Sequence, residues 1–431
     1  MLIIRNDLTD LQSKLESHFG KSGDSAEVRQ IVARVLSDIE IRGDEAVRYY
    51  TQLYDGADIS PEALRVPSRE LEAATQSLTL DERAAIEESI GNVREFHLKT
   101  LPESWTAKNR HGATVGEVYY PIHRVGCYIP GGQVPLISSV VMTCALGQLV
   151  GVPEIVATTP PDPDGHIASP ILATLKLCGV DEVYCIGGIQ AIGALSHGTA
   201  SVPAVDKVFG PGNAYVNEAK RQVFGKVGVD LLPGPSEVMI IADSSAEPRF
   251  IAADLLAQAE HGTGKERIYL ALTEESMLAD VNQAIETQAI DLCHGDEIRK
   301  ILENNFAIFL VDNLHQAAEA ANLIAPEHLE LQVEDAELDN LTTLITTAGA
   351  ILQGHLSPTV LGDFTAGPSH TLPTGFSGHS FSGLRATDFM RRSSIVRYDE
   401  DSLVAARSTV RKFSSMEKLD AHGRSMDIRF T

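Results

Sequence analysis

The chain has 431 residues, of which 43% are hydrophobic and 22% are charged, proportions typical of a globular protein with two or three domains. Thirty-five basic residues against 59 acidic ones give a formal net charge of −24. Nucleic acid and anionic membranes repel such a chain, so we expect small-molecule partners instead.

The five cysteines include no Cys-x-x-Cys pair, which argues against a disulfide framework and against a cysteine zinc site. The first residues carry an apolar run shorter than that of a signal peptide, and no window has 18 uninterrupted apolar residues. We therefore expect a reduced, cytoplasmic protein that neither enters nor crosses a membrane.

The first hundred residues are predicted to be helical. Residues 26–54 and 68–97 carry apolar side chains at spacings of three and four, the pattern of amphipathic helices. No catalytic constellation stands out in this region.

From about residue 115 the pattern becomes an alternation of strands and helices. Strand-like segments end in glycine-rich turns such as "IPGG", "IGG" and "FGPG", and each is followed by a helical segment. A second region of the same kind follows from about residue 237. This alternation predicts an α/β fold with parallel, doubly wound sheets.

We expect the following division of the chain: an N-terminal helical segment (1–25), a first α/β domain (26–125 and 237–384), a second Rossmann-like domain (126–236) and a helical C-terminal tail (385–431). A Gly-, Ser- and His-rich loop spans 361–383, and its length without periodicity indicates a functional loop.

A metal site is suggested by "DLLAQAEHG" (254–262). Gln258 and His261 are spaced to share one face of a helix, in its last turn, where the helix dipole favours a cation. Asp254 lies on the same face as a further candidate ligand or as an ordinary exposed carboxylate. The other oxygen and nitrogen donors are distant in sequence, and spacing alone does not assemble them: Asp363, His370, Glu417 and His422.

The glycine turns allow two interpretations. "FGPGN" (209–213) could hold a phosphate at a helix N-terminus, but it is not the GxGxxG pattern, and glycine also serves in any tight turn. In the purely structural interpretation Asn213 is an N-cap, Gln190 an ordinary first-turn residue and Tyr128 an aromatic residue at a strand end.

The segment "IAPEHLEL" (324–331) places Glu327 beside His328, after a proline that ends the preceding helix. The two side chains form either a loop ion pair or a proton-handling pair. Histidine, with an ordinary pKa of about 6.5, is suited to act as a general base at neutral pH.

Seven long motifs in one order resemble the histidinol dehydrogenase family, and the resemblance runs from about residue 30 to the end. They are "HRVGCYIPGG", "KVFGPGNAYVNEAKRQVFGKVGVD", "GPSEVMIIAD", "DLLAQAEHG", "APEHLEL", "GDFTAGPSHTLPTGF" and "LDAHGRS". The resemblance implies an aldehyde-dehydrogenase-like fold with two Rossmann-like halves that lack GxGxxG.

The same resemblance implies an activity and a set of site residues. L-histidinol would be oxidised to L-histidine in two NAD⁺-dependent steps through a bound aldehyde, the end of histidine biosynthesis. The homodimer would share its active sites, with one Zn²⁺ per subunit. The zinc ligands would be Gln258, His261, Asp363 and, from the partner subunit, His422. These four would also contact the substrate, together with Ser236, His328, His370 and Glu417.

In this assignment Tyr128, Gln190 and Asn213 would contact NAD⁺. His328 would be the base in both oxidations, and Glu327 would activate the water that adds to the aldehyde. The first α/β domain would carry the zinc and the acid–base residues, the second would bind NAD⁺, and the tail would mediate dimerisation.

Four residues in three places depart from the usual family pattern: Ser369, Ile189 and Gly262-Thr263. They leave open a related zinc enzyme that oxidises another small polar alcohol. A zinc hydrolase, active without nucleotide, and a non-catalytic binding protein are the more distant alternatives.

Overall fold

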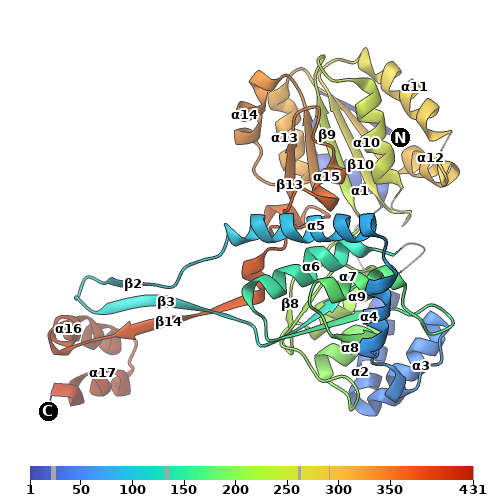
Figure 1. The fold of residues 1–431 in the computed structure, drawn as a ribbon. Helices are drawn as coiled ribbons and strands as arrows, with labels where there is room; N and C mark the ends of the chain where they lie inside the picture. Colours follow the sequence, from blue (N-terminus) through green and yellow to red (C-terminus); the bar gives the residue numbers. More distant parts are fainter. Residues whose placement is uncertain (21–25, 132–134, 261–263, 291, 431) are drawn as a thin grey trace.

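The computed structural model describes the chain except for residues 21–25, 132–134, 261–263, 291 and 431. Figure 1 shows two α/β layers, one above the other, and an arm that projects from the lower one. Within the described ranges, no helix combines the length and the apolar character that a membrane span requires.

The large sheet, in the upper layer, has six parallel strands. Their order is β1 (Leu2–Arg5), β11 (Phe306–Leu310), β10 (Arg267–Leu272), β9 (Glu237–Ala242), β12 (His328–Gln332) and β13 (Ala350–Gln353). The central strands are buried on both faces, as expected for a parallel sheet covered by helices. One face packs against α10 (Pro248–Ala259), α11 (Met277–Ala289) and α12 (Gly295–Asn304). The other face packs against α1 (Leu11–Phe19), α13 (Leu314–Ile324) and α14 (Asp335–Leu344).

The small sheet, in the lower layer, has five parallel strands. Their order is β6 (Glu182–Cys185), β5 (Glu154–Thr159), β4 (Arg124–Tyr128), β7 (Lys207–Phe209) and β8 (Gly228–Val229). Helices of the same segment share its core: α6 (Ile137–Val150), α7 (Ser169–Leu177), α8 (Gly188–His197) and α9 (Ala214–Val223). The predicted alternation of strands and helices is therefore confirmed in both layers.

The predicted division of the chain differs from this packing in two places. Residues 1–25 were expected to be helical, but β1 comes first and pairs in parallel with β11 at the edge of the large sheet. Residues 26–125 were grouped with 237–384, but their helices belong to the core of the small sheet. These are α2 (Ala26–Arg42), α3 (Asp44–Asp55), α4 (Ser68–Ser77) and α5 (Leu80–Leu98). In this core α2 contacts α8 and α9, α4 contacts α7, and α5 contacts α6.

The arm comprises residues 105–121 and 390–430. Its antiparallel sheet joins β2 (Trp105–Lys108), β3 (Thr114–Pro121) and β14 (Met390–Arg397), and α16 (Glu400–Met416) and α17 (Asp420–Asp427) lie at its far end (Figure 1). The tail from residue 385 was expected to be helical throughout, and this prediction was wrong for β14. The strand exists because its backbone pairs with β3, a partner distant in sequence.

Candidate active site

The strand β12 presents a row of polar side chains to one face of the large sheet. Side chains alternate between the faces of a strand, so Leu329 and Leu331 enter the core under α13. His328, Glu330 and Gln332 point to the opposite face, and all three are buried. His328 is the first residue of β12, so its ring lies at the amino-terminal edge of the sheet.

Glu327 reaches the same edge because the chain turns sharply before it. Helix α13 ends at Ile324, the next residue, Ala325, adopts a left-handed conformation with φ 51°, and Pro326 prevents the helix from continuing. The Glu327 carboxylate accepts a hydrogen bond from the backbone N–H of Glu237, with an N–O distance of 2.8 Å. Burial raises the pKa of Glu327 well above its ordinary value, and the charges of Glu237 and Asp363 raise it further. The predicted end of the helix before Pro326 is therefore confirmed.

Asp363 and His370 come from the long loop to the same place. Asp363 lies in the short helix α15 (Thr359–Phe364). Its Oδ1 is 3.8 Å from Nε2 of His328 and 3.5 Å from Nδ1 of His370. On the other side of the His328 ring, Nδ1 is 3.8 Å from Oε2 of Glu327. The structure thus brings together four of the predicted residues, with an imidazole between two carboxylates.

Gln258 is buried in the last turn of α10, and its amide nitrogen has no hydrogen-bond partner among the described residues. His261, predicted to share its helix face, lies outside the described residues, as do Gly262 and Thr263. Amide and carboxylate oxygens together with imidazole nitrogens are a donor set that suits zinc. The described part of a single chain contains no group of three His, Cys, Asp or Glu side chains that could hold a metal ion. The groups present fit part of a zinc site, which the described residues do not complete.

Two buried charged residues beside Glu327 were not singled out from the sequence. Glu237 follows the predicted substrate contact Ser236, and its carboxylate forms an ion pair with Arg267 at an N–O distance of 3.3 Å. Burial raises the pKa of Glu237 to about 7, although the Arg267 charge opposes the shift. The motif "GPSEV" contained this residue, but nothing in its spacing indicated a buried partner 30 residues later.

The long loop is attached to the small sheet as well. Ser369, one of the departures from the family pattern, is buried and donates a hydrogen bond from Oγ to the backbone oxygen of Met142 in α6. Ser89 and Asn92 of α5 donate to the backbone oxygens that follow Asp363, those of Phe364 and Thr365. The loop therefore connects the two layers at the site.

The three residues predicted to contact NAD⁺ lie at the carboxyl ends of β4, β6 and β7. Tyr128 is buried, accepts a hydrogen bond from the Gly188 N–H at 3.4 Å, and has its pKa raised by burial to about 12. Gln190 is buried and donates to Asp55 at 2.8 Å. Asn213 is exposed and caps α9, because its side chain accepts from the first N–H groups of that helix. Asn213 alone of the three presents an exposed side chain.

The turn "FGPGN" is held by internal contacts. The N–H of Gly210 donates to Asp230 at 2.8 Å, and Asp230 forms a fully buried ion pair with Lys220. A Cβ on Gly210, whose φ is 109°, would lie 2.1 Å from the backbone oxygen of Tyr128. Glycine is therefore required here by close backbone packing and positive φ. This supports the turn interpretation over a dedicated phosphate loop.

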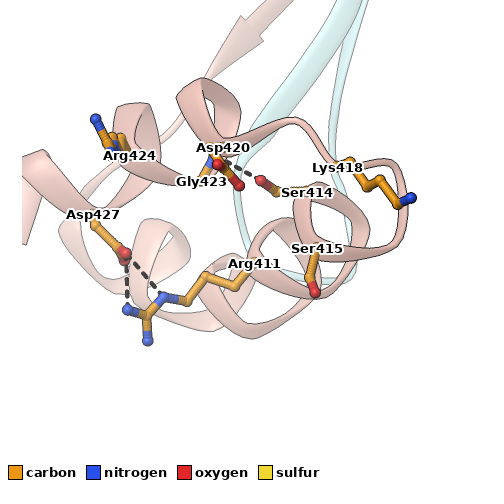
Figure 2. Close-up of a pocket in the computed structure, with 8 residues that line it drawn as sticks. All are labelled: Arg411, Ser414, Ser415, Lys418, Asp420, Gly423, Arg424 and Asp427. Carbon is orange, nitrogen blue, oxygen red and sulfur yellow. Dashed lines mark hydrogen bonds and ion pairs between the residues drawn. The ribbon is translucent and has the colours of Figure 1, made fainter.

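Glu417 and His422 are exposed and lie in the arm, away from the large sheet (Figure 1). Glu417 follows α16 at the start of the turn between α16 and α17, and His422 lies in the first turn of α17. Ser414 accepts a hydrogen bond from the Gly423 N–H at 3.0 Å, and Arg411 pairs with Asp427 at 2.8 Å. Figure 2 shows the shallow hollow beside this turn, lined by Arg411, Ser414, Ser415, Lys418, Asp420, Gly423, Arg424 and Asp427. One chain therefore does not bring these two residues to the other predicted site residues.

Comparison with known proteins identifies the family. A family model described as "Histidinol dehydrogenase" matches residues 20–430. The histidinol dehydrogenase of Geobacter sulfurreducens is 41% identical over 404 residues, which are 94% of this chain and 93% of that one. That of a Synechococcus strain is 38% identical and covers 100% of this chain and 99% of its own.

A solved structure agrees with the sequence comparisons. The crystal structure of histidinol dehydrogenase from Elizabethkingia anophelis has a TM-score of 0.93 at 33% identity, covering 100% of this chain and 98% of that one. This match confirms the predicted fold class. The chain belongs to the histidinol dehydrogenase family, which consists of oxidoreductases of histidine biosynthesis.

Proposed function

We propose that this chain oxidises L-histidinol to L-histidine in two successive NAD⁺-dependent steps through the aldehyde, as a zinc-containing homodimer with shared active sites. The observation that carries the proposal is the buried imidazole of His328, held between the carboxylates of Glu327 and Asp363. An alcohol oxidation releases a proton and a hydride, and this cluster contains a group suited to take the proton.

His328 acts as the general base in both oxidations. Its position at the first residue of β12 fixes the ring on a rigid element, and the carboxylate of Asp363 stabilises the imidazolium that forms when the ring accepts a proton. The same ring first takes the alcohol proton and later that of the aldehyde hydrate.

Glu327 serves the water step between the two oxidations. Burial raises the pKa of the Glu327 carboxyl, so it binds a proton more tightly than an exposed carboxyl and is a stronger base toward the water. The N–H of Glu237 fixes one of its oxygens, which leaves the other for the water that adds to the aldehyde.

Gln258, His261 and Asp363 would hold the zinc, with His422 supplied by a second copy of the chain. Bound zinc would supply a positive charge that orients the imidazole and amine of the substrate, and bound NAD⁺ would accept the hydride. Ser236, His370 and Glu417 complete the substrate contacts, and Tyr128, Gln190 and Asn213 mark the side from which the nicotinamide approaches.

The position of the arm supports the proposed dimer. Glu417 and His422 are exposed at its far end, and in one chain the arm extends away from the large sheet (Figure 1). A second copy is therefore the source of these two groups for each site.

The test measures how many NADH form for each histidine. Zinc-loaded protein given L-histidinol and NAD⁺ is expected to form two NADH per histidine. No absorbance change at 340 nm would refute the proposal. Turnover of another small polar alcohol in place of histidinol would show that the Ser369 and Ile189 departures have changed the substrate.

A further inference from the structure

A second cluster of buried polar side chains lies next to the acid–base residues, further along β12 on the same face of the large sheet. Nε2 of Gln332 donates to Asp254 at 2.8 Å and to Glu330 at 3.1 Å. Oε1 of Glu330 accepts two bonds from Thr359, one from its backbone N–H and one from its hydroxyl, both at 2.7 Å. Four residues from three separate elements thus form one hydrogen-bonded unit.

Each of these elements also carries a residue of the proposed site. Asp254 precedes Gln258 by one turn of α10, so both lie on the same face of that helix. Thr359 precedes Asp363 by one turn of α15. On β12, Glu330 follows His328 by two positions and therefore shares its face of the sheet.

Charge and hydrogen bonding favour a single arrangement of this cluster. Glu330 is 1% exposed and places its carboxylate at the first N–H of α15, the position where a helix favours negative charge. Burial, with the nearby charge of Glu330 and a hydrogen bond to it, raises the pKa of Asp254 to about 8. At neutral pH the Asp254 carboxyl therefore keeps its proton and donates it to Glu330, while accepting from Gln332. Leaving a buried polar group without its hydrogen-bond partner costs free energy. The network therefore resists movement of any one element.

We propose that Glu330 and Asp254 are positioning residues that lock α10, β12 and α15 together and so fix Gln258, His328 and Asp363 relative to one another. The inference rests on the proposed function, because it takes those three residues as the site. It assigns Asp254, a candidate ligand by sequence, to the support of the site.

Three variants test this. Glu330→Ala removes the acceptor for Thr359. Asp254→Leu keeps the approximate volume of the side chain but removes its hydrogen bonds. Asp254→Asn keeps a neutral donor toward Glu330 and an acceptor for Gln332, so it should behave like the parent. Glu182→Gln is the matched control, because it removes the charge of a part-buried carboxylate bonded to Arg124 and Tyr184 at the amino end of the small sheet.

Three quantities should be measured. The first is hydrogen exchange of the peptide that covers 359–364. The second is zinc affinity, by competition with a chelator. The third is kcat and KM for histidinol. In Glu330→Ala and Asp254→Leu we expect faster exchange in α15, a zinc affinity lower by about 10- to 100-fold, and a kcat lower by about 100-fold with a smaller change in KM. In Asp254→Asn and Glu182→Gln, zinc affinity and kcat should remain within about threefold of the parent values. This change is smaller than the decrease of about 10-fold or more expected for Glu330→Ala and Asp254→Leu.

The outcomes separate the two proposals. If Glu330→Ala and Asp254→Leu leave exchange in α15 and zinc affinity unchanged, or if Asp254→Asn is as damaged as Asp254→Leu, the positioning role is refuted. If exchange and zinc affinity change as expected but the parent protein oxidises no histidinol, the positioning role stands and the proposed function fails.

Discussion

The two parts of the candidate site are built in opposite ways. At the edge of the large sheet, Glu327 and His328 are buried, and neighbouring elements hold their side chains. At the end of the arm, Glu417 and His422 are exposed. Under the proposed function, the fold of one chain preorganises the acid–base residues, whereas the residues of the arm would take up their role only against the surface of a second copy.

The arm exposes apolar side chains that a second copy could cover. Its helix α16 buries only a few small side chains, Ser402, Ala406 and Ser414. Large apolar residues of the arm are more than half exposed: Val396, Val404, Phe413, Met416 and Ile428. Burying such side chains against a second copy would stabilise the proposed dimer.

The largest expected effect concerns the acid–base residues at the edge of the large sheet. His328→Ala should lower kcat by about 10³-fold for histidinol and also for the aldehyde supplied directly, because both oxidations lose their base. Single-turnover NADH formation with each substrate measures this. His315→Ala is a control on the surface of the preceding helix α13. An effect on only one of the two oxidations would show that the base is not shared.

The next prediction tests whether the arm of a second copy completes the site. His422→Ala should lower kcat/KM by about 100-fold, because a misplaced substrate reacts poorly. Mixing His422→Ala with His328→Ala under conditions that exchange subunits should restore about one quarter of the parent activity, since half of the dimers then carry one intact site of two. No recovery in a mixture shown to contain heterodimers would mean that each chain completes its own site.

A third prediction divides the acid–base residues from each other. Glu327→Ala should slow the oxidation of the aldehyde by about 100-fold and leave that of the alcohol within a few-fold of the parent, because only the second oxidation requires added water. The two half-reactions are followed separately by NADH formation. Glu334→Ala, an exposed carboxylate just beyond β12, is the control. Equal loss in both half-reactions would contradict this division of roles.

The smallest effect concerns α5, the helix that joins the preorganised edge to the small sheet. His97 of α5 is buried, and burial followed by the charge of Arg385 lowers its pKa to about 4. Because the folded state binds this proton less tightly than the unfolded chain, stability is retained above about pH 6.5 and falls as the pH drops toward 4. The His97 contribution to the free energy of unfolding should fall by about 2 kcal/mol between pH 7 and pH 5.

Urea unfolding at the two pH values measures this contribution. His97→Gln should lose less stability than the parent over that interval, and the exposed His166→Gln should lose as much as the parent. If His97→Gln and the parent respond equally to pH, the buried histidine is not the sensitive group.

Local patterns sufficed for much of the fold. The alternation of strands and helices and the junction at Pro326 were visible in the sequence, because hydrophobic periodicity and turn residues encode them. The strands β1 and β14 were missed because backbone pairing with distant segments, β11 and β3, defines them. The helices of residues 26–98 were assigned to the wrong sheet for the same reason, since an amphipathic face does not specify its partner.

The site shows the same limit. The alternation in "HLELQ" already places Glu330 and Gln332 on the face of His328. Their contacts with Thr359 and Asp254 join segments that no spacing rule connects. The seven motifs implied the candidate residues by resemblance, with His422 from a partner subunit, but not the contacts that hold Glu327 and Asp363 in place.

The pairing of β3 with β14 also affects how the protein is made. During synthesis β2 and β3 emerge early, but the outer edge of β3 finds its partner only when the last part of the chain appears, because Pro121 pairs with Met390. Until then a long strand with exposed backbone groups is open to pairing with other molecules. A transcript truncated near its 3′ end would therefore yield a chain with both main cores and an unpaired edge, prone to aggregation and a substrate for chaperones.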